Sequence, residues 1–133
     1  QKYAGVAELA RDPAQLRNFL RMEKWIFDSP DQAGEAFRQF ITWFYRENRL
    51  VAGTLGIGGK PVRLRNLTMP VLNVHATQDH LVPPAATTVL KDLVGTADYT
   101  DYAFSGGHIG IYVSGRAQKD LPAAISDWLK SRS

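Results

Sequence analysis

The sequence predicts an α/β protein in which a helical first part precedes two parallel strands and their helices. Apolar residues recur at helical spacing up to about residue 48. Two short apolar runs, 70–76 and 99–104, then have the composition of buried strands. Helical patterns follow both runs, and strands that alternate with helices favour a parallel sheet with right-handed crossovers.

The helical part contains two start signals. Asp12, Pro13 and Gln15 have the order of a capped helix start, with proline at the first helical position. The segment SPDQ (29–32) repeats this signal, and the apolar residues after it predict a long amphipathic helix up to about Asn48. The aromatic residues of these helices could line a path for an apolar acyl chain, but helical spacing favours a simple core: Trp25, Phe27, Phe37, Phe40, Trp43 and Phe44.

The second part reads as turn, strand, helix, strand and helix. The segment GIGGK (56–60) predicts a plain turn, because its glycine spacing does not fit a phosphate-binding loop. We expect a strand up to Ala76, with His75 as a satisfied core residue, then a helix over 88–94 that Gly95 ends. A second strand over 99–104 and a last helix from about Asp120 follow. Both strands are apolar enough that burial on both faces is expected.

Composition excludes several classes of function. The chain has 133 residues, 44% hydrophobic and 22% charged, which is typical of one folded domain. The absence of cysteine excludes disulfides, thiolate metal sites and a cysteine nucleophile within these residues, and fits the cytoplasm. The net charge of +3 is spread along the chain, which argues against nucleic-acid binding. No apolar run reaches the length of a membrane span, and three scattered histidines do not suggest a metal site.

Asp79 and His108 are the candidate catalytic residues. Each follows one of the two predicted strands, and the carboxyl ends of parallel strands meet at the edge where α/β sheets place their chemistry. A carboxylate that accepts a hydrogen bond from one imidazole nitrogen leaves the other nitrogen free to take a proton. Asp79 could instead only make a turn, and His108 in its glycine loop could be incidental.

Three blocks of sequence resemble a known family. They are MEKWIFDSPDQAGEAFRQF (22–40), TMPVLNVHATQDHLVPP (68–84) and GGHIGIYVSGRAQ (106–118). Together they resemble polyhydroxyalkanoate synthases, most closely the class III catalytic subunit, which works with a second, non-catalytic subunit of the PhaE type. The resemblance implies the C-terminal part of an α/β-hydrolase fold, with residues 1–58 as a helical cap segment and 59–133 as the last strands and helices of the core.

The resemblance also implies a reaction and its residues. The family transfers (R)-3-hydroxyacyl groups from coenzyme A to a growing polyester, using a cysteine nucleophile. By the motif match, His108 would be the general base that activates the thiol. Asp79 would orient His108 or itself help to deprotonate the incoming hydroxyl. His80 matches a motif position without an assigned role. No cofactor beyond the acyl-coenzyme A substrate and no metal are expected, and the substrate-binding residues are unassigned.

The missing cysteine shapes the remaining expectations. Because these residues contain no cysteine and begin at Gln1, we expect the nucleophile to lie upstream of them. The chain would then be the C-terminal portion of a synthase. We expect this portion to be inactive by itself. An unpaired strand edge then predicts self-association, such as a homodimer, or co-assembly with the nucleophile-bearing part. The family's cytoplasmic setting, at polyester granules, is expected for localisation.

Two other functions fit the same residues. A serine hydrolase of the same fold, such as a lipase, esterase or depolymerase, would share the Asp and His, and a serine in place of the upstream cysteine would reveal it. A non-catalytic association module would keep the pair only as a relic and would tolerate the loss of His108. Tyr112 and Arg116 follow the histidine loop and could contact substrate or coenzyme phosphates, or serve the structure.

Overall fold

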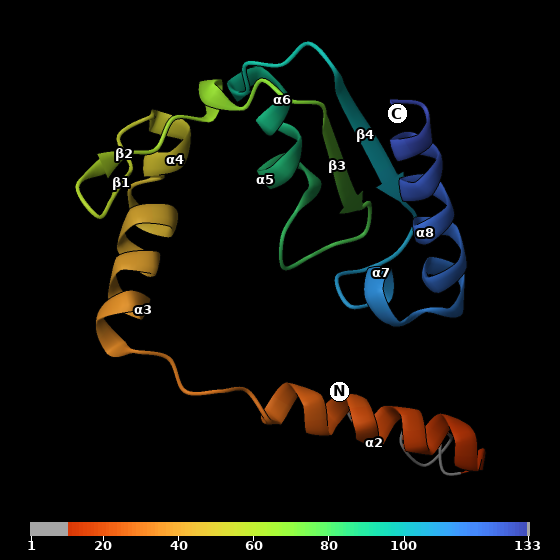
Figure 1. Cartoon of the computed structure of the whole chain (residues 1–133). Helices are drawn as coiled ribbons and strands as arrows, with labels where there is room; N and C mark the ends of the chain where they lie inside the picture. Colours follow the sequence, from red (N-terminus) through yellow and green to blue (C-terminus); the bar gives the residue numbers. More distant parts are fainter. Residues whose placement is uncertain (1–10, 133) are drawn as a thin grey trace. The chain divides into compact units, whose positions relative to one another are not determined.

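The computed structural model describes residues 11–132, which form two compact units divided after Thr42 (Figure 1). The first unit contains α2 (Pro13–Phe27) and α3 (Gly34–Phe40). The second contains both pairs of strands and the remaining α-helices, and the π-helical turn η1 (Ile41–Arg46) continues α3 across the division. The expected division into a cap segment (1–58) and a core segment (59–133) stays a prediction. Residues 1–10 and 133 of these two segments lie outside the described part.

Helix α2 begins as the sequence predicts. The Asp12 carboxylate accepts hydrogen bonds from the backbone N–H groups of Ala14 (2.8 Å) and Gln15 (3.3 Å), and from the Gln15 side chain (2.8 Å). These bonds satisfy N–H groups that have no partner inside the helix. The predicted cap at Asp12 is confirmed.

The second predicted helix differs at its start and in its interior. The segment 29–32 is not a helix start, because Ser29 donates its hydroxyl to the Ile26 carbonyl and so closes the end of α2. Helix α3 begins only at Gly34, without a side-chain cap, and passes into the wider π-helical turn after Phe40. The backbone then leaves the helix at Asn48, whose φ of 46° is left-handed, close to the predicted end.

The aromatic residues of these helices are less buried than a simple core requires. The exposed fraction is 62% for Trp25, 74% for Phe27, 52% for Phe37 and 47% for Phe40. Only Trp43 and Phe44 are half-buried. The predicted simple core is therefore not formed by the first four within the described residues.

The glycine segment makes the predicted turn, within a small hairpin. Helix α4 (Arg49–Ala52) leads to antiparallel strands β1 (Gly56–Ile57) and β2 (Lys60–Pro61). Gly58 and Gly59 between them both have positive φ, 56° and 75°, which residues with side chains rarely adopt. A short 3₁₀ turn, η2 (Leu64–Asn66), then leads to the larger strands.

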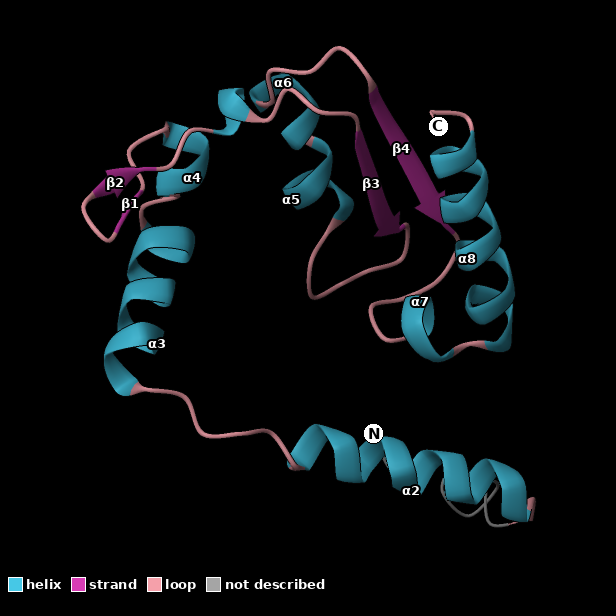
Figure 2. Cartoon of the chain, viewed as in Figure 1, coloured by secondary structure: helices cyan, strands magenta, loops and turns pink. Residues whose placement is uncertain are grey.

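The two predicted strands are present and parallel (Figure 2). Strand β3 (Val71–Ala76) pairs with β4 (Tyr99–Phe104) in a register that begins at Val71 and Tyr99 and ends at Ala76 and Phe104. Among residues 11–132 this sheet has only two strands. The mixed α/β class and the parallel pairing are therefore confirmed, and the described helices and strands are consistent with a piece of an α/β fold.

The helices around β3 and β4 differ in detail from the prediction. The helix predicted over 88–94 is two short helices, α5 (Pro84–Thr88) and α6 (Leu90–Leu93), and it begins earlier because Pro84 fits a first helical turn. A short helix α7 (Gly110–Val113) was not predicted. Helix α8 (Gly115–Lys130) starts before Asp120, because the Ser114 hydroxyl caps it through the Ala117 N–H at 3.1 Å, and it carries Pro122 in its interior.

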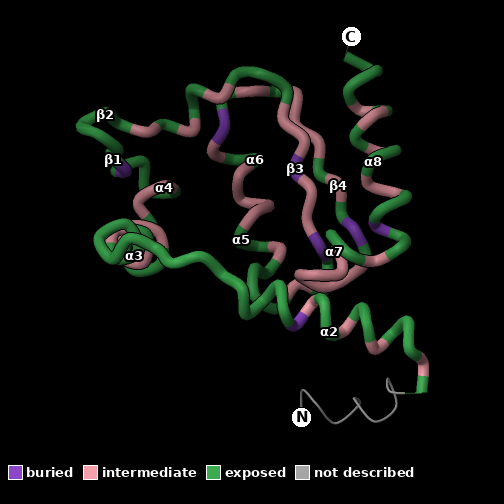
Figure 3. The backbone as a smooth tube through the Cα atoms, turned by 60° about the horizontal axis from the view of Figure 1, so that its bottom comes forward, coloured by how far each residue is buried: buried purple, intermediate pink, exposed green. Residues whose placement is uncertain are grey.

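Helices α5 and α8 contact opposite faces of the strand pair. Thr87 of α5 donates to Asn73 at 2.8 Å, whereas the Trp128 indole of α8 donates to Thr100 at 3.1 Å. Asn73 is paired with Asp101, so Thr100 faces the other way. Buried residues cluster at the carboxyl ends of the strands, at Ala76 and Phe104 (Figure 3). Asn73 is also buried, but the other residues of these two strands are half-buried or, at Asp101 and Ala103, exposed. Burial on both faces is therefore not complete in this structure.

Candidate active site

The loops that follow β3 and β4 are joined by backbone hydrogen bonds. The strands end together at Ala76 and Phe104. Beyond that point the Thr77 N–H donates to the Phe104 carbonyl at 2.8 Å, and the Gln78 N–H donates to the Gly106 carbonyl at 2.9 Å. The two loops therefore continue the pairing of the strands, and they hold Asp79 and His108 at the same edge of the sheet.

Asp79 is fixed by its own loop. Its Oδ1 accepts the N–H groups of Leu81 at 2.9 Å and Val82 at 2.8 Å, as in an Asx turn, while Oδ2 is left for another donor. The side chain is 10% exposed. Burial disfavours the charged form, but the bonds from Val82, His108 and Leu81 and the charge of a protonated His108 outweigh it, so the pKa of Asp79 lies below its ordinary value. The carboxylate is therefore ionised at neutral pH.

His108 completes the pair. Its Nδ1 lies 2.7 Å from Oδ2 of Asp79, and its side chain is 37% exposed. An ionised carboxylate can only accept, so Nδ1 carries the hydrogen and Nε2 of the neutral ring keeps its lone pair. Within the described residues no hydrogen bond engages Nε2. The predicted meeting of Asp79 and His108 is thus present in the structure, with one ring nitrogen available for a proton.

The pair borders an open pocket of about 170 Å³. Its lining comes from β3, the Asp79 loop, α5 and α7: Val74, His75, Ala76, Asp79, Val82, Thr87, His108, Ile111 and Tyr112. Tyr112 is 71% exposed at its rim. The pocket therefore combines apolar side chains with the carboxylate of Asp79 and the imidazoles of His75 and His108, as small-molecule sites commonly do.

A polar bridge beneath this pocket was missed in the sequence. Buried Asn73 donates to the Asp101 carboxylate at 2.8 Å and accepts from the Thr87 hydroxyl at 2.8 Å. It thereby links β4, β3 and α5. No sequence signal reveals it, because Asn73 and Asp101 become neighbours only through the register of the two strands.

His75 is not the satisfied core residue that was expected. Its Nδ1 is buried and forms no hydrogen bond within the described part of the chain. A carboxylate oxygen of Asp101 lies 3.9 Å away, beyond hydrogen-bond distance, and it accepts from Asn73. His80, next to Asp79, is exposed. Neither histidine joins the Asp79–His108 pair.

Arg116 contacts the histidine loop rather than the pocket. Its Nη2 donates to the Ser105 carbonyl at 3.2 Å, and its guanidinium lies 4.9 Å from the centre of the Phe104 ring. In the described residues no cluster of three or more potential ligands could hold a metal ion. No helix of that part is both long and apolar enough to cross a bilayer.

The structure thus defines an α/β protein in which an acid and an imidazole meet at the carboxyl edge of a parallel strand pair, the edge where such proteins commonly place their chemistry. No known family profile matches the chain. Its sequence is 58% identical to "Poly(3-hydroxyalkanoate) polymerase subunit PhaC" of Allochromatium vinosum over 99% of the chain, and 55% identical to the subunit of the same name in Thiocystis violacea over 100% of the chain. A third such subunit, from Haloferax mediterranei, is 40% identical over 99% of the chain.

The resemblance to the C-terminal portion of catalytic polyhydroxyalkanoate synthase subunits is therefore confirmed, and the chain is a relative of PhaC. The chain spans 37%, 38% and 27% of the length of these three relatives.

Proposed function

We propose that residues 1–133 supply the acid and base of a polyhydroxyalkanoate polymerase. The reaction transfers an (R)-3-hydroxyacyl group from coenzyme A to a growing polyester and releases coenzyme A. The single observation that carries the proposal is the 2.7 Å contact between His108 Nδ1 and Asp79 Oδ2, which leaves Nε2 free. The identity of 55–58% to PhaC subunits supports it.

In this proposal His108 moves protons for a thiol that another stretch of polypeptide carries. Nε2 takes the thiol proton, and the thiolate attacks the thioester carbonyl of the acyl-coenzyme A. The bond to the coenzyme sulfur breaks, and the imidazolium returns the proton to that leaving thiolate. The hydroxyl of a second acyl group then gives its proton to Nε2 and attacks the enzyme thioester, which forms an ester and restores the thiol.

Asp79 fits the orienting role better than that of a direct base. Its Oδ2 is engaged with His108, and its Oδ1 with the N–H groups of Leu81 and Val82. A carboxylate with both oxygens engaged and a lowered pKa is a weak base for a substrate hydroxyl. We therefore assign Asp79 to hold the His108 tautomer and to stabilise the imidazolium.

The rest of the proposed enzyme would join at the open edge of β3. In residues 11–132 this strand pairs with β4 alone, so its other edge has backbone groups free for a further strand. We propose co-assembly there with the cysteine-bearing part of the polymerase. A PhaE-type subunit, a homodimer and a cytoplasmic place at polyester granules are further expectations that rest on the family resemblance.

Release of coenzyme A from (R)-3-hydroxybutyryl-coenzyme A tests the proposal. The full-length natural protein should release coenzyme A, whereas residues 1–133 alone should not. Alkylation by iodoacetamide should abolish the rate, whereas a serine-directed fluorophosphonate should leave it unchanged. Sensitivity to the fluorophosphonate would instead support a serine hydrolase. Release by residues 1–133 alone that disappears in His108→Ala would contradict the proposed need for an external thiol.

A further inference from the structure

Three consecutive carbonyl groups hold the start of the His108 loop. The carbonyls of Phe104 and Gly106 accept the N–H groups of Thr77 and Gln78, at 2.8 and 2.9 Å, and so tie this loop to the Asp79 loop. The carbonyl between them, of Ser105, accepts Nη2 of Arg116 at 3.2 Å. Without Arg116, the central one of the three groups would have no protein donor in the described structure.

Arg116 is itself held in place. Its guanidinium lies over the ring of Phe104, 4.9 Å from the ring centre, and Phe104 is only 3% exposed. Asp120, one turn further along α8, lies 3.6 Å from Nε. A buried ring and a carboxylate thus orient the fork of donors toward the loop, although the side chain is 59% exposed.

We propose that Arg116 is a positioning residue that sets where His108 stands relative to Asp79. This inference rests on the proposed function of the pair. Arg116 fixes the Ser105 carbonyl, three residues before His108, while the neighbouring carbonyls fix the distance to the Asp79 loop. Displacement of a catalytic group by about 1 Å can cost about 100-fold in rate, so a brace at this point acts on turnover and leaves substrate affinity unchanged.

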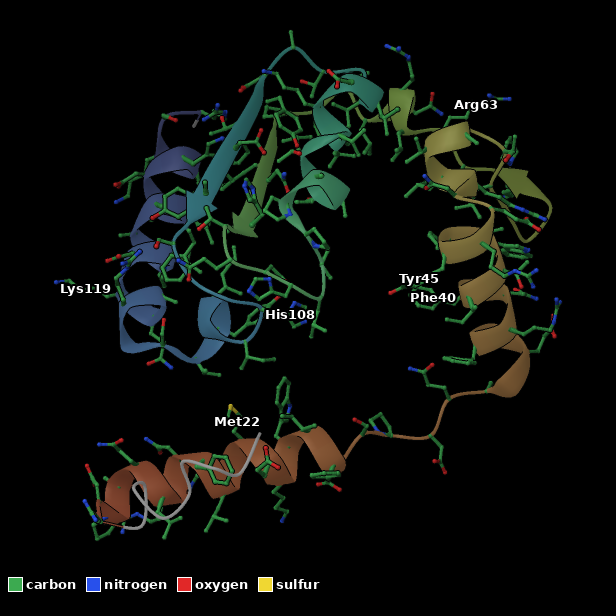
Figure 4. All side chains as sticks on the ribbon, turned by 180° about the vertical axis from the view of Figure 1, so that it is seen from behind. Met22, Phe40, Tyr45, Arg63, His108 and Lys119 are labelled. Carbon is green, nitrogen blue, oxygen red and sulfur yellow. The ribbon has the colours of Figure 1, made fainter. Side chains whose placement is uncertain are left out.

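The same helix offers two matched controls. Arg132 stacks over the ring of Trp128, 4.2 Å from its centre, and pairs with Asp98, but it lies at the far end of α8 and touches neither catalytic loop. Lys119 carries one positive charge on α8 and points outward, away from His108 (Figure 4). Arg132→Ala therefore reproduces the loss of a stacked arginine, and Lys119→Ala the loss of a charge.

Steady-state coenzyme A release by the natural polypeptide in full is the first test. Arg116→Ala should lower kcat by about 10- to 100-fold with KM changed less than about twofold. Arg116→Lys, which keeps a donor for the Ser105 carbonyl, should recover a large part of kcat. Lys119→Ala and Arg132→Ala should keep kcat within about twofold. A raised KM with unchanged kcat in Arg116→Ala would overturn the proposal and would indicate that Arg116 contacts the phosphates of coenzyme A. Unchanged kcat and KM would also overturn it.

Amide hydrogen exchange separates this inference from the proposed function. Arg116→Ala should speed exchange of the Gln78 and Thr77 amides by about 10-fold, because both donate to the braced loop. Arg132→Ala should leave these two amides unchanged. This comparison needs no turnover, so it decides the role of Arg116 even if coenzyme A release fails. Equal protection in Arg116→Ala and in the unsubstituted protein would overturn the proposal.

Discussion

His108 and Asp79 lie 29 positions apart in the sequence, and their side chains meet at 2.7 Å. The distance depends on backbone pairing, because two hydrogen bonds beyond the strands, from Thr77 and Gln78, join the loops that carry the pair. The acid is further aligned by two N–H groups of its own loop. The pair is thus preorganised by main-chain bonds that do not depend on substrate.

Loss of either member of the pair should abolish most of the proposed turnover. Asp79→Asn keeps the size of the side chain but removes the charge, so the His108 ring loses the partner that fixes its tautomer. We expect coenzyme A release to fall by about 10³- to 10⁴-fold, and by a similar factor in His108→Ala.

His80→Ala is the control for that comparison, because His80 neighbours Asp79 but is exposed and outside the pair. It should release coenzyme A within about threefold of the unsubstituted protein. Full activity of His108→Ala would show that the pair is a relic and would support a binding module.

Sequence reasoning succeeded where short-range chemistry decides the structure. The Asp12 cap, the Gly58–Gly59 turn and both strands follow from local residue types, and the strand ends then bring Asp79 and His108 to one edge. It failed where the outcome depends on distant partners. Neither the Asn73 bridge nor the unsatisfied Nδ1 of His75 is visible without knowing that Asp101 stands beside Asn73.

Helix boundaries failed for a related reason. The same kind of start signal produced a helix after Asp12 but not after Ser29, because the Ser29 hydroxyl instead donates to the carbonyl at the end of α2. Conversely, Pro122 lies inside α8 rather than in its first turn, and the cap at Ser114 sets the true start. In both places a local hydrogen bond from a serine side chain marks where the helix ends or begins.

Gly106→Ala should distort the histidine loop. A Cβ at this position would lie 2.7 Å from the Phe104 ring, which is buried and covered by Arg116. We expect a loss of about 1–3 kcal/mol in the free energy of unfolding, as for other overpacked sites, together with reduced coenzyme A release.

Gly110→Ala is the matched control, because a Cβ there would meet nothing within 4 Å. Urea unfolding of the intact protein should show no loss of stability for this variant. Equal stability of both alanine variants would contradict the tight contact between Gly106 and the ring.

Thr87→Val should destabilise the protein by breaking the Asn73 bridge. Valine has the shape of threonine but no hydroxyl, so the side-chain oxygen of Asn73, a residue only 8% exposed, would lose its donor. An unsatisfied buried acceptor costs about 1–3 kcal/mol in the free energy of unfolding.

Thr88→Val provides the comparison, since Thr88 is the next residue of α5 and is half-buried. Its effect should stay within about 0.5 kcal/mol. Both values come from urea midpoints of the intact protein, and equal losses in the two variants would refute a specific role for the bridge.

Stability should fall in acid partly through the pair of Asp98 and Arg132. Arg132 donates to Asp98 at 2.5 and 2.8 Å and so ties the start of β4 to the end of α8. The hydrogen bonds from Arg132 lower the pKa of Asp98, and the positive charge of Arg132 lowers it further. Desolvation raises this pKa but does not outweigh them. The folded state therefore holds this proton less tightly than the unfolded state, whose Asp pKa is about 3.9. The stabilisation is complete well above that value and is lost as the pH falls through the lower folded pKa.

Unfolding of the intact protein between pH 6 and pH 2 measures this contribution. Asp98→Asn removes the titrating group, so the variant should start less stable at pH 6 and lose less stability between pH 4 and pH 2 than the unsubstituted protein. Asp92→Asn serves as the reference, because Asp92 is an exposed carboxylate of α6 to which the structure gives no such partner among the described residues. Parallel stability curves for Asp98→Asn and the unsubstituted protein would mean that the bond to Arg132 contributes nothing, as is common for exposed ion pairs. A convergence of the two curves at low pH would show that the start of β4 is anchored to α8 by a charge that acid removes.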